Sequence, residues 1–236
     1  MKIALCLLTR NEHECLKVIF PKIPPPTPES GYDSIYAIDG GSVDGTIEYF
    51  KEHNVPVIGQ SKRGRGEAFL LAFKQIDADA YIFFSPDGNE EIDDLPQFRK
   101  HLESGADLVI ASRMMPGAFN EEDVSFWRPR KWANKVFNLL ANLFFRDSSH
   151  NSFVTDSING YRAIKKTAAN TLALDASDYT IEYQMTMRAL STNLNIQEFP
   201  THEGQRVAGE TGAQSIPTGV RFIKRFISEL KRKNAK

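Results

Sequence analysis

The chain has 236 residues, of which 41% are hydrophobic and 25% charged, and its formal net charge is −1. These values are typical of a globular protein with a large buried core, and they argue against nucleic-acid binding, which favours a basic surface. Apolar runs stay short of the roughly 20 residues that a membrane-spanning helix needs, so we expect a cytoplasmic protein. The two cysteines, Cys6 and Cys15, are expected to be reduced packing residues.

The first half of the chain alternates apolar runs with amphipathic segments. The apolar runs predict buried parallel strands at residues 3–8, 34–38, 55–58, 80–84 and 107–111. The amphipathic segments predict helices at residues 12–20, 44–53, 65–76 and 93–104. This alternation predicts an α/β fold, an open and mostly parallel twisted sheet with helices on both faces. The proline-rich segment 21–28 interrupts the alternation and should be an extended surface connection.

The second half of the chain is less regular. Helices are predicted at residues 131–145, 166–173, 180–192 and 217–233, and a strand at 195–199. Loops rich in Gly, Pro, Thr or charged residues separate these elements, and the segment 159–164, Asn-Gly-Tyr-Arg-Ala-Ile, is assigned to neither helix nor strand.

Polar residues follow four of the predicted strands at the point where each strand ends. They are Thr-Arg-Asn-Glu at 9–12, Asp39, Pro-Asp-Gly-Asn at 86–89 and Ser-Arg at 112–113. In open α/β sheets, ligands bind outside the carboxyl ends of the strands. The four strand ends should therefore converge on one ligand site.

The segment 38–46, Ile-Asp-Gly-Gly-Ser-Val-Asp-Gly-Thr, is the most informative stretch of the sequence. A buried strand ends in an acid, and a glycine turn then opens a helix, which is a nucleotide-binding arrangement because glycine lets a ligand approach the backbone closely. The alternative is a well-built turn in which Ser42 or Asp44 caps the helix.

The segment 85–90, Ser-Pro-Asp-Gly-Asn-Glu, repeats this pattern after the fourth strand. Oxygen atoms of Asp87 and Asn89 suit Mg²⁺ or Mn²⁺, which would neutralise a diphosphate leaving group. The alternative is an Asx turn stiffened by Pro86.

Taken in order, these motifs resemble those of the family 2 glycosyltransferases. The matching pieces are residues 9–12, 39–46, 64–68 (Gly-Arg-Gly-Glu-Ala) and 85–87, and the resemblance covers residues 1–115 well and continues more weakly to about 210. The dolichyl-phosphate mannose synthase branch is the most similar, through residues 111–113, 128–131, 156–162 and 206–211. The resemblance implies the A-type nucleotide-sugar fold and an inverting transfer from a nucleoside-diphosphate sugar. It divides the chain into a donor half (1–115), an acceptor half (116–216) and a basic helix (217–236).

The resemblance also implies roles for individual residues. Metal binding falls to Asp87 and Asn89, and catalytic or phosphate-binding roles fall to Arg113, Asp156 and Arg162, with Arg130 as a further phosphate contact. Donor binding falls to Thr9, Asn11, Glu12, Asp39, Arg63, Gly64, Gly66, Ser85 and Arg128. The planar guanidinium suits phosphate oxygens, although a surface ion pair is the alternative for each arginine.

Two positions depart from the family pattern. Ser85 stands where the first acid of the metal-binding turn is usual, and Gly40 replaces the second acid of the earlier motif. The metal site would then have lost a ligand or a water contact, so a catalytically silent nucleotide-sugar-binding domain is an alternative. A nucleotidyltransferase is disfavoured because residues 9–20 contain no glycine.

The acceptor determines whether a general base is needed. A polyprenyl phosphate, the preferred acceptor, is already ionised near neutral pH, whereas a glycan or other hydroxyl acceptor needs a base. Candidate bases are Asp156, Glu182 and His202, of which Asp156 is the first choice. The sequence does not identify the sugar or the nucleoside.

The last segment, 217–236, places apolar residues at helical spacing among seven basic ones. This pattern is typical of a helix at an anionic membrane surface, which would place the protein at the inner membrane face. The alternative is a helix docked on its own domain with a solvated basic face.

Overall fold

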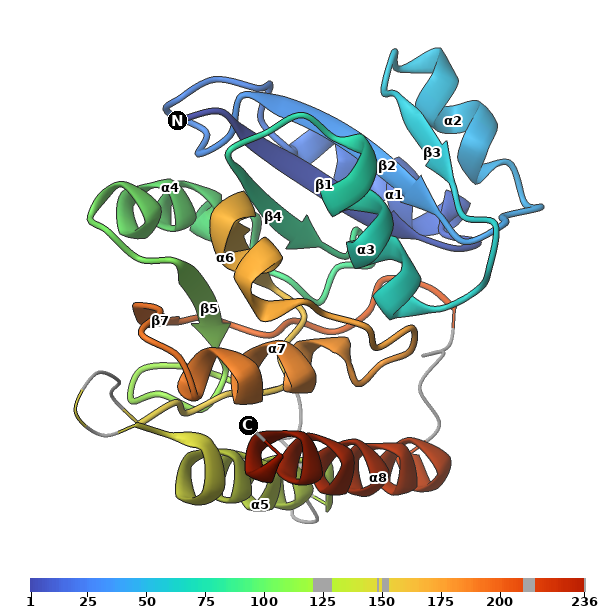
Figure 1. The fold of residues 1–236 in the computed structure, drawn as a ribbon. Helices are drawn as coiled ribbons and strands as arrows, with labels where there is room; N and C mark the ends of the chain where they lie inside the picture. The colour runs from blue at the N-terminus through green and yellow to red at the C-terminus, as the bar shows by residue number, and fades with distance from the viewer. Residues whose placement is uncertain (121–128, 148, 150–152, 210–214, 236) are drawn as a thin grey trace.

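A seven-stranded sheet forms the centre of the molecule (Figure 1). The structure, a computed structural model, describes residues 1–120, 129–147, 149, 153–209 and 215–235. The strand order is β3-β2-β1-β4-β6-β5-β7, and every neighbouring pair is parallel except those that involve β6. The strands are β1 (Ile3–Thr9), β2 (Ser34–Asp39), β3 (Val57–Gly59), β4 (Ala80–Phe84), β5 (Leu108–Ser112), β6 (Arg162–Lys165) and β7 (Ile196–Pro200).

The predicted α/β fold with an open, mostly parallel sheet is confirmed. The α-helices are α1 (His13–Ile19), α2 (Thr46–Glu52), α3 (Arg65–Gln75), α4 (Leu95–Glu103), α5 (Pro129–Phe145), α6 (Lys166–Leu172), α7 (Ile181–Leu190) and α8 (Ser215–Asn234). Short 3₁₀ helices occupy Phe20–Lys22 and Ile92–Asp94. Each predicted helix and strand is present within two residues of its expected bounds.

Alternating side chains of the central strands build two hydrophobic cores, one on each face of the sheet. On β4, Phe83 packs with α3, α6 and α7, whereas Phe84 packs on the other face with α1, α2 and α4. Both faces of β4 and β5 are buried, which explains their unbroken apolar runs.

The strand that the sequence did not predict, β6, lies between β4 and β5 and runs antiparallel to both. Because of this reversal, the beginning of β6 lies at the edge where the parallel strands end. The preceding segment is fixed there by two amides of α5: Asn142 Oδ1 accepts from Val154 N at 2.8 Å, and Asn138 Oδ1 accepts from Ser157 N at 2.8 Å.

Helix α7 lies between the sheet and an outer layer formed by α5 and α8 (Figure 1). All ten residues of α7 are buried, including four polar ones. Arg188 on α7 donates to both carboxylate oxygens of Glu229 on α8, each at 2.8 Å, and Gln184 Nε2 donates to Glu229 Oε1 at 2.5 Å. Helix α8 is therefore docked on the body of the molecule, since it satisfies the outward polar groups of α7.

Candidate functional site

Two acids that follow neighbouring strands bind the same guanidinium. Glu12 follows β1 and Asp87 follows β4, which pair with each other in the sheet. Arg206 Nη1 donates to Asp87 Oδ2 at 2.7 Å, and Arg206 Nη2 lies 2.5 and 2.6 Å from the two carboxylate oxygens of Glu12. The structure thus brings together two acids that the sequence assigned to the site. It adds Arg206, for which the sequence indicates no role beyond its place in a family-like loop.

The loop that carries Arg206 covers the turn that carries Asp87. Val207 N donates to the backbone oxygen of Asp87 at 2.8 Å, and Gly204 N donates to that of Asn89 at 2.8 Å. Gly88 has a φ of 98°, and a Cβ on it would lie 2.6 Å from Val207 Cγ2. Glycine at 88 therefore permits both the turn and its close contact with the loop.

Burial dominates the electrostatics of this pair of acids. It raises the pKa of Glu12 and of Asp87, while the nearby Arg206 acts in the opposite direction on both. Two partly desolvated carboxylates that share one cation form a site suited to positive charge.

The same oxygens could hold a divalent cation in place of the guanidinium. Asp87, Glu12 and the amide of Asn89 offer hard oxygen ligands of the kind that Mg²⁺ and Mn²⁺ take. Within the described ranges, no group of three or more His, Cys, Asp or Glu side chains is placed to hold a metal. A metal here would therefore complete its shell with water or with oxygens of a bound diphosphate.

Glu90 lies beside Ser85, the position that lacks the usual acid. Its Oε2 accepts from Ser85 N at 2.7 Å, and burial, with a smaller contribution from Asp87, raises the pKa of Glu90 to about 8 against the opposing effect of Arg65. Arg65 Nη1 donates to Ser85 Oγ at 3.3 Å and pairs through Nε with Glu182. Glu182, a candidate base from the sequence, is therefore a buried partner of Arg65.

Arg113 and Asp156 form a second pair at the end of β5. Arg113 donates to both oxygens of Asp156, at 2.8 and 3.1 Å, and to Glu203 Oε1 at 2.8 Å. The two acids, and Asp156 above all, raise the pKa of Arg113 well above its ordinary value, although burial alone would lower it. Asp156 has no exposed surface, so in this structure it orients Arg113 rather than facing a substrate.

Arg162 is also fully buried. Its guanidinium donates to the backbone oxygens of Asn159 at 2.7 Å and Glu182 at 2.9 Å. Burial lowers its pKa to about 10, against the opposing effect of Glu182 and Asp156. This placement ties β6 to α7 and does not present the guanidinium to a ligand.

The turn after β2 is internally bonded. Asp39 is buried, and its carboxylate accepts from Gly41 N at 2.9 Å, from Ser42 N at 2.8 Å and from Thr9 Oγ1 at 3.3 Å. Asn11 joins the same turn, since its backbone N donates to Ser42 Oγ at 2.8 Å. Asp39 thus holds this turn together, and Thr9 and Asn11 contact it, but neither Ser42 nor Asp44 caps α2, whose N-cap is Gly45. A role of Asp39 in donor binding stays a prediction.

The glycines at the start of α3 allow its backbone to approach the backbone of residues 176–177 closely. A Cβ on Gly64 would lie 2.0 Å from the backbone oxygen of Ser177, and one on Gly66 would lie 2.0 Å from that of Ala176. Arg63, just before them, is exposed. Arg128 and the side chain of Arg130 lie outside the described residues.

His202 is exposed on the loop that leads to Arg206, and its ring stacks on Phe119 with centroids 4.5 Å apart. Cys6 and Cys15 are free and buried, and the Cys15 thiol donates to the backbone oxygen of Ala208 at 3.4 Å. That contact adds to the attachment of the Arg206 loop.

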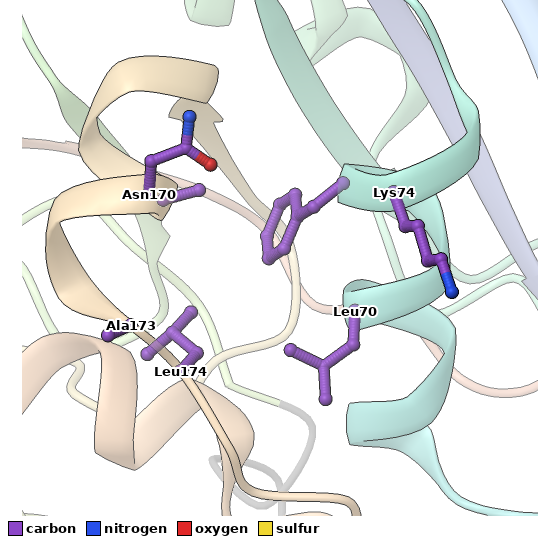
Figure 2. Close-up of a pocket in the computed structure, with 7 residues that line it drawn as sticks. Leu70, Lys74, Asn170, Ala173 and Leu174 are labelled. Carbon is purple, nitrogen blue, oxygen red and sulfur yellow. The ribbon is translucent and has the colours of Figure 1, made fainter.

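A pocket elsewhere on the surface does not suit a charged ligand. It lies between α3 and α6, where Leu70 points toward Leu174 and the Lys74 ammonium extends away from the opposite wall (Figure 2). Lys74 is its single charged lining residue. The polar strand ends therefore remain the candidate site.

The chain is similar to known glycosyltransferases. The chain is 28% identical over 204 residues to the glycosyltransferase AglJ of Haloferax volcanii, with 84% of this chain and 62% of that protein covered. It is 28% identical over 214 residues to the polyprenol monophosphomannose synthase of Mycolicibacterium smegmatis, with coverages of 85% and 77%. The chain thus spans less than two thirds of the first relative's length.

Solved structures confirm the A-type glycosyltransferase fold. Glucosyl-3-phosphoglycerate synthase from Mycobacterium tuberculosis, in a complex with Mn²⁺, UDP and glucosyl-3-phosphoglycerate, matches with a TM-score of 0.71 at 20% identity over 98% of this chain and 80% of that one. The model of the family described as "Glycosyl transferase family 2" matches residues 29–172. The chain therefore belongs to glycosyl transferase family 2, as its motifs predicted.

Proposed function

We propose that this protein is a metal-dependent, inverting glycosyltransferase that moves a sugar from a nucleoside-diphosphate sugar to a polyprenyl phosphate. The observation that carries the donor assignment is the convergence of Glu12 and Asp87 on one cation at the carboxyl edge of the sheet. In open α/β folds this edge is where nucleotides bind. The Mn²⁺ and UDP in the solved relative support the same assignment.

Asp87 and Asn89 would hold Mg²⁺ or Mn²⁺ in the proposed enzyme, with Glu12 adding negative charge. A divalent cation there supplies charge stabilisation to the departing diphosphate. Because Arg206 already binds both acids, the guanidinium must move when the donor arrives. It is then free to meet phosphate oxygens, for which its planar fork is suited. Inversion is what the family membership implies for direct attack opposite the diphosphate.

The acceptor assignment follows from the state of the candidate bases. Asp156 is buried and paired with Arg113, and Glu182 is buried and paired with Arg65. A hydroxyl nucleophile needs a base within hydrogen-bond reach, whereas a phosphate monoester is already ionised. The pairing of both acids therefore favours a phosphate acceptor, in keeping with the relative that is a polyprenol monophosphomannose synthase. Arg113, which keeps a small exposed surface, would position the acceptor phosphate.

The donor is tested first, by thermal unfolding of the protein with UDP-, GDP- and dTDP-sugars in the presence of Mn²⁺. Preferential binding to the folded state raises the melting temperature, by an amount that grows with ligand concentration over Kd. Asp87→Asn should abolish the metal-dependent part of this shift. The matched control is Asp77→Asn, because Asp77 is highly exposed just before the opposite end of β4.

Transfer is tested by following labelled sugar from the preferred donor into butanol-extractable lipid, with polyprenyl phosphate as acceptor. The expected result is metal-dependent label in the lipid fraction. Label on a soluble glycan and none in lipid would overturn the acceptor assignment. Donor binding without transfer or hydrolysis would point instead to a silent nucleotide-sugar-binding domain, the alternative that Ser85 raises.

A further inference from the structure

Helix α5 exposes apolar side chains on the face turned away from the body. Trp132, Val136, Leu139 and Leu143 follow helical spacing and are all more than half exposed, up to 70% for Leu143. The other side of α5 is buried against the body of the molecule. It includes Ala141, Phe145 and the hydrogen-bonded amides Asn138 and Asn142. An ordinary surface helix would carry polar residues on its outer face. Within the part of the chain that the structure describes, no neighbouring element buries this outer stripe.

Helix α8, which packs beside α5, also exposes apolar side chains. Val220, Ile223 and Ile227 are each about half exposed, whereas Phe222 and Phe226 pack inward. The two helices lie side by side as the outermost layer (Figure 1), joined by the ring pairs Phe137–Phe222 and Phe144–Phe226. We define the outer apolar face by these exposed residues: Trp132, Val136, Leu139, Leu143, Val220, Ile223 and Ile227.

Charge is distributed unevenly around this face. The sequences of α5 and α8 together contain nine of the 29 basic residues of the chain and one of its 30 acidic residues. That one acid, Glu229, is buried and bound to Arg188. The rest of the chain therefore has an excess of acidic side chains. Lys135, Arg221, Lys224 and Lys231 are exposed on the two helices.

We propose that the outer apolar face docks on an anionic lipid bilayer, with the exposed stripe of α5 in the interface and the basic residues of both helices at the headgroups. A basic rim around an apolar face is the pattern that binds such surfaces. A second copy of the chain fits less well, because pairing through this face would oppose two strongly basic helix pairs. In the described residues, no helix is long and apolar enough to cross a membrane, so the contact is interfacial.

The assignment differs from the one that the sequence suggested, which placed membrane contact on residues 217–236 alone. The inward residues of α8 are used to dock it on α5 and α7, so α5 supplies the larger exposed apolar stripe. The inference goes beyond sugar transfer and does not depend on it. A protein of this family with a soluble acceptor could bind membranes, and one with a lipid acceptor could fail to do so.

The test is flotation of the full chain with vesicles that contain neither polyprenyl phosphate nor a sugar nucleotide. The wild type should float with phosphatidylcholine vesicles that contain about 30% phosphatidylglycerol, and binding should fall without the anionic lipid and in high salt. The double variant Leu139→Ser/Leu143→Ser should bind at least about tenfold more weakly, because each exposed leucine contributes apolar area to the contact. The double variant Lys224→Gln/Lys231→Gln should bind the anionic vesicles about fivefold more weakly for each lysine replaced.

The matched control is Val18→Ser/Val43→Ser, which replaces two exposed valines on other parts of the surface and should bind as the wild type does. Unfolding midpoints of all variants establish that they are folded. The proposal is overturned if the leucine variant binds as tightly as the wild type. It is also overturned if the wild type ignores anionic vesicles and instead forms a dimer that the leucine variant loses. Because no donor or acceptor is present, neither result bears on the proposed transfer.

Discussion

Arg206 and Asp87 lie 119 residues apart in the chain, yet a guanidinium nitrogen and a carboxylate oxygen of the two residues are 2.7 Å apart. The same guanidinium binds Glu12, so a built-in cation occupies the place between two acids at the sheet edge. A divalent metal that uses Asp87 must compete with this arginine. The competition leads to a direct prediction.

Replacing Arg206 with Ala should tighten Mn²⁺ binding in the absence of nucleotide. The metal would no longer displace a charge-assisted pair worth on the order of 1.5 kcal/mol, which corresponds to about a tenfold gain in affinity. Titration of free Mn²⁺ by electron paramagnetic resonance measures this. Arg206→Lys keeps a positive charge and should bind metal nearly as the wild type does. Unchanged or weaker metal binding by the alanine variant would show that Arg206 does not compete with the metal.

Glu90 should make the protein less stable as the pH rises. Burial raises its pKa from 4.5 to about 8, with Asp87 acting in the same direction and Arg65 against it. Between these values the folded state holds a proton that the unfolded state has lost, so the free energy of unfolding falls with increasing pH. A tenfold difference in proton affinity between the two states corresponds to about 1.4 kcal/mol. We therefore expect the free energy of unfolding to fall by on the order of 1 to 3 kcal/mol between about pH 5.5 and 8.5.

Urea unfolding at the two pH values measures this difference. Glu90→Gln cannot ionise and should show a smaller pH dependence than the wild type. Glu48→Gln, on the exposed surface of α2, should leave the dependence unchanged. If the unfolding free energies of the wild type and Glu90→Gln change equally with pH, Glu90 is not the group responsible.

Neutralising Asp156 should destabilise the fold. Its buried carboxylate binds Arg113 through two side-chain nitrogens, and removing one charge of such a pair costs about 3–5 kcal/mol because the other stays buried without its partner. Glu203 also pairs with Arg113, so the loss of unfolding free energy in Asp156→Asn should lie near the lower end of this range. The measurement is the midpoint of urea unfolding, with Asp77→Asn as the surface control. A change below about 0.5 kcal/mol, the usual range for surface substitutions, would rule out a positioning role for the pair.

Removing His202 separates the two acceptor classes. It is the candidate base that is exposed rather than buried in an ion pair. With a phosphate acceptor, His202→Ala should keep kcat/KM within about threefold of the wild type. With a hydroxyl acceptor that uses His202 as base, the loss should be at least about 100-fold, the usual contribution of general base catalysis. A large loss with polyprenyl phosphate would mean that the histidine takes part in transfer to a phosphate as well.

The sequence predicted most of the fold because the parallel strands are buried on both faces and appear as continuous apolar runs. Strand β6 was not predicted, since it is only four residues long and begins at Arg162. That arginine can lie in the interior because its guanidinium donates to the backbone oxygens of Asn159, three residues before it, and of Glu182 on α7. No local pattern in the sequence reveals such an arrangement.

The site was predicted in part for the same reason. Glu12 and Asp87 end neighbouring parallel strands, so their proximity follows from the sheet. The contact with Arg206 depends on how a long loop returns across the molecule, and the sequence shows only the loop. The motif around Asp156 predicts a base, but whether its carboxylate is solvated or paired with an arginine depends on tertiary contacts that the motif does not show.

Because β6 is antiparallel, the chain supplies residues to the edge of the sheet that carries the candidate site in two ways. Parallel strands supply them after they end, whereas β6 supplies Asp156 and its neighbours before it begins. Segments that enter a reversed strand can change in length or composition without altering the spacing of the motifs around Glu12 and Asp87. In the proposed enzyme, such a scaffold would let the acceptor side vary while the donor side stays constant.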